Sequence, residues 1–269
     1  MTRNVLRYLS IGFAFLWMAE PAGSQLVQLR HWSGQAVSPA YDGYDVNPDG
    51  SFNMWFGYMN RNYEEELDIP IGPDNNFEPG GDRGQPTHFM VRRHKDVFRV
   101  VVPKDFGNQK LVWTLRAQGE TAQVTGTLNA VWMIDRLRTT RGGNSEKVNS
   151  NTPPLVTIDP QEQTILFPSP GSVKLNISAT DDGLPKRAGK TVGMTVMWTK
   201  YRGPGTVTFD SPKAPLTDGK AVAVANFSEP GEYTIQAVVD DGSGEAAGNF
   251  GYHCCWTNIQ TRITVRKSE

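Results

Sequence analysis

The sequence lacks any stretch in which apolar residues recur at helical spacing over the roughly 11 residues that identify an amphipathic helix. Beyond the N-terminus it also lacks an apolar run of the roughly 20 residues that a membrane-spanning helix requires. Glycine and proline are plentiful, at 27 and 18 of 269 residues, and both favour turns. These features argue against a helical bundle and a helical membrane protein, and they favour an all-β chain.

Charge of one sign is not in excess, because 27 lysines and arginines face 28 aspartates and glutamates. Basic residues cluster only in two short runs, residues 92–95 and 136–141, which we interpret as solvated faces or linker. Binding to a phosphate backbone requires a basic stripe. We therefore expect no nucleic-acid partner.

The sequence also lacks the motifs of common catalytic and zinc sites, namely Gly-x-Ser-x-Gly, His-Glu-x-x-His and paired Cys-x-x-Cys. Its histidines show no spacing that would pair one with a nucleophile; they are His31, His88, His94 and His253. Residues 64–66 with Asp68 could supply paired carboxylates, but successive strand residues point to opposite faces, so we interpret them as an exposed acidic patch. We predict a non-catalytic protein and name no catalytic residue.

The N-terminus has the pattern of a secretory signal. Arginines precede an apolar run at residues 8–19, which is too short to span a bilayer, and small residues follow at 22–24. We predict a signal peptide at residues 1–24 and cleavage before Gln25. The mature protein is then expected to be exported, whether periplasmic, cell-surface or secreted, without a membrane span.

Alternation with period two marks short strands in the N-terminal half. Phe52, Met54, Phe56 and Tyr58 alternate after a turn at 47–50, and further strands are expected at 98–102, 111–115 and 122–128. Residues 69–87 are rich in proline and glycine, so we expect a long ordered loop without a regular ladder. Residues 25–138 are predicted to form a β-sandwich-like module.

Residues 139–152 lose all apolar periodicity and predict a linker. Strands at the short, regular spacing of a sandwich follow it. They are expected at 155–158, 173–179, 194–198, 206–209, 221–227, 233–239 and 258–265. We therefore predict two antiparallel β-sandwich, immunoglobulin-like modules, the second at residues 153–269.

Several fragments of the C-terminal half identify a family pattern: residues 179–183, a mid-core Trp198, residues 203–209, residues 227–233 and residues 239–242. On these fragments residues 152–266 resemble a PKD-type immunoglobulin-like domain, and the whole chain is similar to uncharacterised exported bacterial proteins. The resemblance implies a spacer, adhesion or ligand-presenting module, and the fold itself assigns no activity. It also places Trp198 in the core of the third strand and Tyr233 at a corner before the sixth. After Trp198, residues 199–203 replace the aromatic-aspartate-glycine signature of many PKD repeats.

The two cysteines, Cys254 and Cys255, are adjacent. An exported chain normally bridges its cysteines, yet Cα atoms ~3.8 Å apart across a trans peptide are closer than the usual ~4.4–6.8 Å of a disulfide. Three interpretations stay open: a vicinal disulfide that stiffens a turn, which we favour, two reduced thiols, or intermolecular bridges. Together with His253 the pair could recruit a soft metal such as copper.

The tripeptide Asp-Asp-Gly occurs twice, and each copy directly follows a predicted strand. In an immunoglobulin-like sandwich these two strands lead into loops at the same pole. Five carboxylates are therefore expected to converge: Asp181, Asp182, Asp240, Asp241 and Glu245. Such a cluster requires a cation or hydrogen bonds, and Ca²⁺ prefers oxygen ligands. A calcium site is the functional hypothesis, and ordinary Asp-Gly turn chemistry is the alternative.

Aromatic residues crowd the first strands of the N-terminal module, and their rings offer rigid faces to sugars or protein partners, unless most belong to the core. The candidate ligand-binding residues are Trp32, Trp55, Tyr58 and Tyr63. Trp55 is the best surface candidate because it is out of phase with its apolar neighbours. We predict a binding or adhesion protein with a protein or glycan partner at the cell envelope. The alternatives are an accessory or metal-handling protein of an extracytoplasmic enzyme system and a structural envelope component.

Overall fold

The regular secondary structure of the described residues is almost entirely β-strand, and buried and exposed side chains alternate along the strands. This confirms the all-β prediction. The computed structural model describes residues 31–134, 151–169, 171–183, 186–187, 190–191, 193–242 and 255–268. The predicted signal peptide and most of the predicted linker lie outside the described residues. In the part of the chain that is described, no helix is long and apolar enough to cross a membrane.

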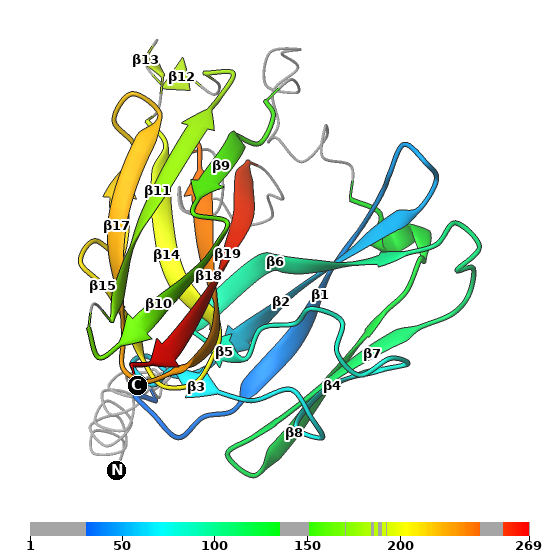
Figure 1. The fold of residues 1–269 in the computed structure, drawn as a ribbon. Coiled ribbons are helices and arrows are strands. Elements are labelled where there is room, and N and C mark those ends of the chain that lie inside the picture. Colours follow the sequence, from blue (N-terminus) through cyan, green and yellow to red (C-terminus); the bar gives the residue numbers. More distant parts are fainter. Residues whose placement is uncertain are drawn as a thin grey trace, which may run out of the picture. The chain divides into compact units, whose positions relative to one another are not determined.

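The N-terminal module contains two three-stranded antiparallel sheets (Figure 1). The first has the order β1-β2-β6, with β1 (Val37–Val46), β2 (Phe52–Asn60) and β6 (Arg92–Val102). The second has the order β4-β7-β8, with β4 (Asn75–Glu78), β7 (Leu111–Ala117) and β8 (Glu120–Gly126). A short ribbon pairs β3 (Leu67–Asp68) with β5 (His88–Phe89), and the 3₁₀ turn η1 (Ala130–Trp132) follows β8.

Aromatic rings fill the core of this module. Phe77 and Trp113 stack with ring centroids 5.6 Å apart, and Phe56 stacks on Phe98 at 5.7 Å. Such pairs add about 0.5–1.5 kcal/mol each beyond the burial of their area. Met54 and Phe56 are fully buried, so the predicted phase of the second strand is confirmed.

The prediction that residues 69–87 hold no regular ladder is wrong. Asn75–Glu78 form β4, which pairs antiparallel with β7. Pro73 and Pro79 flank this strand rather than interrupt it, so the missing N–H groups fall outside the ladder. The buried Asn75 then fixes the loop, because its Nδ2 donates to the carbonyl oxygens of Ile69 and Pro86 at 2.9 and 2.8 Å.

The C-terminal module has the two-sheet arrangement of an immunoglobulin-like sandwich (Figure 1). One sheet has the order β15-β17-β11-β9, with β15 (Val207–Phe209), β17 (Lys220–Phe227), β11 (Ser172–Thr180) and β9 (Leu155–Asp159). The other has the order β10-β19-β18-β14-β16, with β10 (Glu162–Phe167), β19 (Trp256–Lys267), β18 (Gly231–Asp240), β14 (Thr195–Arg202) and β16 (Lys213–Pro215). A small pair joins β12 (Lys186–Arg187) to β13 (Lys190–Thr191).

Among the named strands of the described residues, the prediction of antiparallel pairing holds except at one edge, where β10 runs parallel to β19. The sequence did not signal β10 or β16, because their residues are mostly exposed and show no clear alternation. Two core positions are confirmed. Trp198 is 3% exposed and Tyr233 is 2% exposed, and the Tyr233 hydroxyl donates to the Glu229 carbonyl oxygen at 2.8 Å, as in a tyrosine corner.

The end of β14 joins the two modules. Tyr201 is buried in the aromatic core of the N-terminal module, its hydroxyl donates to the Gly84 carbonyl oxygen, and its own carbonyl oxygen accepts from the Thr87 N–H at 3.0 Å. On either side, Lys200 pairs with Asp68 at 2.9 Å and Arg202 pairs with Asp82 at 2.7 Å. Residues 31–269 accordingly form one compact unit, while the exact module boundaries stay a prediction.

We predict that Trp198→Ala lowers the free energy of unfolding by about 3–5 kcal/mol, because it empties a core site. Trp198→Phe should lower it by less, since the buried Nε1 of Trp198 has no hydrogen-bond partner among the described residues for the change to remove. Urea denaturation of both variants measures the difference. An unchanged midpoint for Trp198→Ala would contradict the burial of the ring.

We further predict that Tyr201→Ala loosens the N-terminal module although the residue belongs to a strand of the C-terminal module. Hydrogen exchange followed by mass spectrometry should show faster exchange in β4 and in residues 84–89, with β17 unchanged. Val222→Ala, at a 47% exposed position on β17, is the control. Equal exchange in the wild type and Tyr201→Ala would show that Tyr201 does not hold the junction.

Candidate ligand-binding cleft

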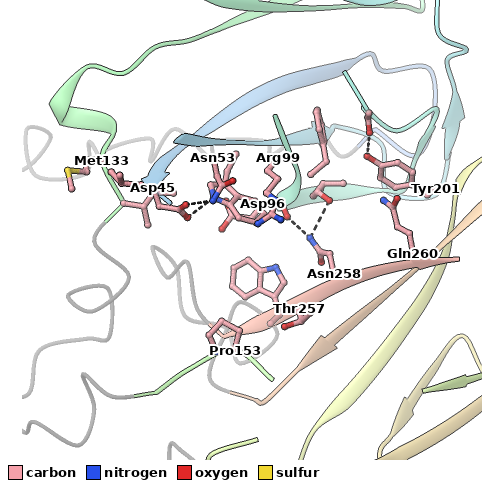
Figure 2. A pocket seen from close by; sticks show the side chains of 17 residues that line it. Asp45, Asn53, Asp96, Arg99, Met133, Pro153, Tyr201, Thr257, Asn258 and Gln260 are labelled. Atoms are coloured by element: carbon pink, nitrogen blue, oxygen red, sulfur yellow. Dashed lines mark hydrogen bonds between the residues drawn. The ribbon is translucent and has the colours of Figure 1, made fainter. Parts of the chain in front are cut away.

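An open cleft of about 1070 Å³ lies where β2 and β6 of the N-terminal module meet β19 of the C-terminal module. Figure 2 shows Asp45, Asn53 and Arg99 on one wall and Asn258 and Gln260 on the other. One wall is formed by outward-facing residues of β1, β2 and β6, and the other by outward-facing residues of β19. The inward faces of these strands belong to the cores of their own modules. The cleft therefore combines the polar sides of two separate sheets.

Trp55 supplies the aromatic surface of the cleft. Its side chain is half-buried on β2, out of phase with the core residues, as predicted. Its indole Nε1 donates to Asp45 Oδ2 at 2.7 Å, and the Arg99 guanidinium lies 5.8 Å from the ring centroid. These contacts restrain the orientation of the ring before any ligand arrives.

A network of amide and carboxylate side chains holds Asp45, the hydrogen-bond partner of Trp55, in place. Asn53 Nδ2 donates to Asp45 Oδ1 at 2.6 Å and to Asn47 Oδ1 at 2.7 Å. Asn47 Nδ2 donates in return to Asn53 Oδ1 at 3.1 Å and to the Ser51 hydroxyl at 2.9 Å. The turn at residues 47–50, predicted from its Asn-Pro-Asp-Gly sequence, thus also positions polar side chains of the cleft.

A bulge in β6 brings residues 96 and 97 close to the C-terminal module. The pairing of β2 with β6 shifts register between Phe56 and Tyr58, and Asp96 adopts a left-handed φ of 46°. A Cβ atom at Gly57 would collide with the His94 carbonyl oxygen, so glycine is required opposite the bulge. On the other side, Asn258 Nδ2 donates to the carbonyl oxygens of Asp96 and Val97 at 2.6 and 3.2 Å.

The predicted aromatic candidates do not all reach this cleft. Trp32, 56% exposed, packs edge-on against Tyr63 at 5.9 Å, and neither residue lines the cleft. Tyr58 is only 2% exposed and belongs to the core, where its hydroxyl oxygen accepts from the Met90 N–H at 3.1 Å, so it presents no open ring face. Tyr58 is buried because it is in phase with the core residues Met54 and Phe56 of β2.

Sequence reasoning missed Asp45, Asn53, Arg99 and Gln260 as cleft residues. Their outward phase was readable, since Arg99 alternates with the buried Phe98 and Val100, and Gln260 lies between Ile259, which packs against the core, and the buried Thr261. Nothing in the sequence indicates that these two outward faces meet.

The two Asp-Asp-Gly tripeptides form the same turn. Asp181 Oδ2 accepts from the Gly183 N–H at 2.8 Å, and Asp240 Oδ1 accepts from the Gly242 N–H at 2.6 Å. Both glycines have positive φ angles, 76° and 84°. This is the turn chemistry stated as the alternative to calcium.

The second aspartate of each tripeptide holds the last residues of the predicted linker. Asp182 Oδ2 accepts from the N–H and hydroxyl of Thr152 at 2.8 and 2.9 Å. Asp241 Oδ2 accepts from Asn151 Nδ2 at 2.9 Å. Asn151 and Thr152 are adjacent, so Asp241 and Asp182 both contact one short segment of the chain. Burial, with a smaller contribution from the nearby Asp182 and Asp241, raises the pKa of Asp181.

The calcium site stays a prediction. Glu245 lies outside the described residues, and among those that are described no group of three or more His, Cys, Asp or Glu side chains could hold a metal ion. Cys255 is buried and disulfide-bonded, and its carbonyl oxygen accepts from the Asp241 N–H at 3.2 Å. Cys254 and His253 lie outside the described residues, so the vicinal ring and the copper site also stay predictions.

A histidine between two carboxylates lies at the junction. His88 Nδ1 is 3.0 Å from Asp68 Oδ1, and its Nε2 is 3.0 Å from Glu66 Oε2. Burial opposes the charged form, but hydrogen bonds to Asp68 and Glu66 raise the pKa of His88 overall. Both ring nitrogens are engaged, so this geometry serves an ion-pair cluster rather than proton transfer to a substrate.

We predict a pH effect at Asp240, whose pKa burial raises from 3.8 to about 6. Because the folded state binds this proton more tightly than the unfolded state, the contribution of Asp240 to the free energy of unfolding should fall as the pH rises from about 4 to about 6. Asp240→Asn keeps an oxygen acceptor for the Gly242 N–H and should flatten that slope. Urea unfolding at several pH values tests this, and parallel slopes in the two proteins would contradict it.

No protein family matches the sequence, and no curated protein matches it. Among solved structures, the chain is similar to domains 4 and 5 of the S-layer protein SbsC, with 12% identity over 86% of this chain and 98% of that chain and a TM-score of 0.27. The D00-D0 domain of intimin has 10% identity, covering 85% of this chain and 100% of that chain, with a TM-score of 0.27. WR4, a C. elegans MSP family member, has 11% identity over 41% of this chain and 96% of that chain, with a TM-score of 0.28. At these scores the likenesses carry no inference about function.

Proposed function

We propose that this chain is an exported, non-catalytic binding protein of the adhesion type, and that its ligand occupies the cleft beside Trp55. The observation that carries the proposal is the indole of Trp55, held between Asp45 and Arg99 in an open cleft whose two walls present amide side chains. Export rests on the signal-like N-terminal sequence.

A glycan is the ligand class that fits this cleft. An indole face packs against the apolar face of a sugar ring, while carboxylate and amide groups accept and donate hydrogen bonds to hydroxyls. Arg99 offsets only one of the two carboxylates, Asp45 and Asp96, so the walls disfavour an anionic ligand and suit an uncharged one. The breadth of the cleft suits a chain of sugars at a surface better than an enclosed small molecule.

The cleft does not favour catalysis. Asp45 already accepts from Trp55 and Asn53, and Asn258 already donates to backbone carbonyl oxygens. These groups are arranged to hold one another in place, which suits recognition without a chemical step.

The proposal predicts that a glycan array probed with residues 25–269 identifies a ligand, and that Trp55→Ala weakens its binding by about tenfold or more. Trp32→Ala, which removes an exposed indole outside the cleft, is the matched control and should bind normally. Isothermal titration calorimetry measures both affinities, and thermal melts check that both variants are folded. Equal affinities for wild type and a folded Trp55→Ala would exclude this cleft as the site.

A further inference from the structure

A second tryptophan lines the cleft beside Trp55. Trp256 is the first residue of β19, and its half-buried side chain reaches the cleft from the C-terminal module. Sequence reasoning did not single it out, because it precedes residues 258–265, where the last strand was expected. The cleft therefore has one indole on the wall of each module.

The register of β19 explains why Trp256 reaches the cleft. β19 pairs antiparallel with β18 along a regular ladder, so residues two apart project from the same face. Ile259 packs against the sandwich core. Trp256, Asn258 and Gln260 project from the opposite face, and all three line the cleft.

The backbone around Trp256 is held on both sides. Cys255, directly before it, is buried and disulfide-bonded, and its carbonyl oxygen accepts from the Asp241 N–H at 3.2 Å. Directly after it, the Thr257 hydroxyl donates to the Pro154 carbonyl oxygen at 2.6 Å. A ring on a restrained backbone loses little conformational freedom when a ligand binds.

The two walls carry the same combination of groups. Trp55 lies beside Asn53 on β2, and Trp256 lies in a row with Asn258 and Gln260 on β19. Each wall thus offers a flat aromatic ring next to polar amide side chains. A ligand that uses both walls has an apolar face on each side and polar groups along its edges.

Trp256 also marks one boundary of the cleft. A neighbouring cleft of about 490 Å³ is lined by Met197, Val238 and residues 92–95, a run that the sequence indicated as a solvated face or linker. The residues that line both clefts are Val97, Tyr201, Trp256 and Asn258. A ligand that contacts both indoles therefore extends along the first cleft to this boundary.

We propose that the cleft binds an uncharged β-1,4-linked oligosaccharide, with Trp55 and Trp256 on opposite faces of the sugar chain. This inference rests on the proposed glycan function and adds a binding residue and the type of linkage. Equatorial β-1,4 linkages make the chain a flat ribbon with C–H groups on both faces and hydroxyls along both edges. The cleft volume of about 1070 Å³ accommodates several sugar units.

A series of defined oligosaccharides tests the linkage and the length. Chitohexaose and cellohexaose are the β-1,4-linked probes, and maltohexaose, the α-1,4-linked isomer of cellohexaose, is the matched control. By isothermal titration calorimetry, one or both β-linked probes should bind residues 25–269 about tenfold or more tightly than maltohexaose and than their own trisaccharides. If neither β-linked probe exceeds maltohexaose, the linkage is wrong. Equal affinities for the trisaccharide and the hexasaccharide would contradict a ligand that spans both indoles.

Substitutions then test the second indole. Trp256→Ala should weaken binding of the hexasaccharide about tenfold, to the level of the trisaccharide. Trp256→Leu keeps an apolar side chain without the flat ring, so it should cause a similar loss, and it decides the question if thermal melts show that the alanine variant does not fold. Trp32→Ala is again the control and should bind normally.

The two tryptophans separate this inference from the proposed function. If Trp55→Ala weakens binding of the hexasaccharide and a folded Trp256→Leu does not, the glycan site stands and the role of Trp256 is wrong. If neither folded variant weakens binding, the cleft is not the site and both proposals fail.

Discussion

The insertion of Tyr201 into the N-terminal core is the contact on which the rest of the structure depends. A strand that belongs to one sandwich ends with a side chain buried among the aromatic residues of the other. The pairing of β14 with β18 shifts register between Lys200 and Arg202, and this bulge marks the point at which the strand leaves the regular ladder. Lys200 and Arg202 then reach Asp68 and Asp82 on either side of the inserted ring.

Each interaction at this junction depends on the others. Lys200 is 5% exposed, and a buried ammonium group is unfavourable unless it is paired, which Asp68 achieves at 2.9 Å. Asp68 in turn shares His88 with Glu66, so one chain of charges extends from the C-terminal module across β3 and β5. Burial of the Tyr201 ring supplies the apolar component, and the ion pairs restrict how the modules can be oriented.

Both clefts follow from this junction. The outer sides of β14, β18 and β19 face the N-terminal module. Their polar and methionine side chains, which would be exposed on an isolated sandwich, therefore line the two clefts. The bulge in β6 adds the other half, since it turns Asp96 and Val97 toward Asn258. The cleft beside Trp55 and the neighbouring cleft lined by Met197 and Val238 therefore both border this contact.

The sequence by itself determined the buried side of the strands that its alternation predicted. Alternation identified Met54 and Phe56 as inward-facing, turn residues identified the Asp-Asp-Gly corners, and the family resemblance placed Tyr233 at its corner. These features are local, since strand period and turn geometry depend on residues a few positions apart. The strand β4 was not predicted, because the prolines of residues 69–87 argue against a strand. Pro73 and Pro79 in fact lie just outside β4.

Only the tertiary structure decided which outward faces meet. Residues 199–203, where the sequence departs from the PKD pattern, contain Tyr201, yet nothing near them in the chain indicates a receiving core more than a hundred residues earlier. Likewise, the sequence presents residues 92–95, Gln236 and Asn258 as ordinary solvated positions. In the structure they lie where the two modules meet. Contacts between distant segments depend on the packing of whole sheets, which short-range patterns do not encode.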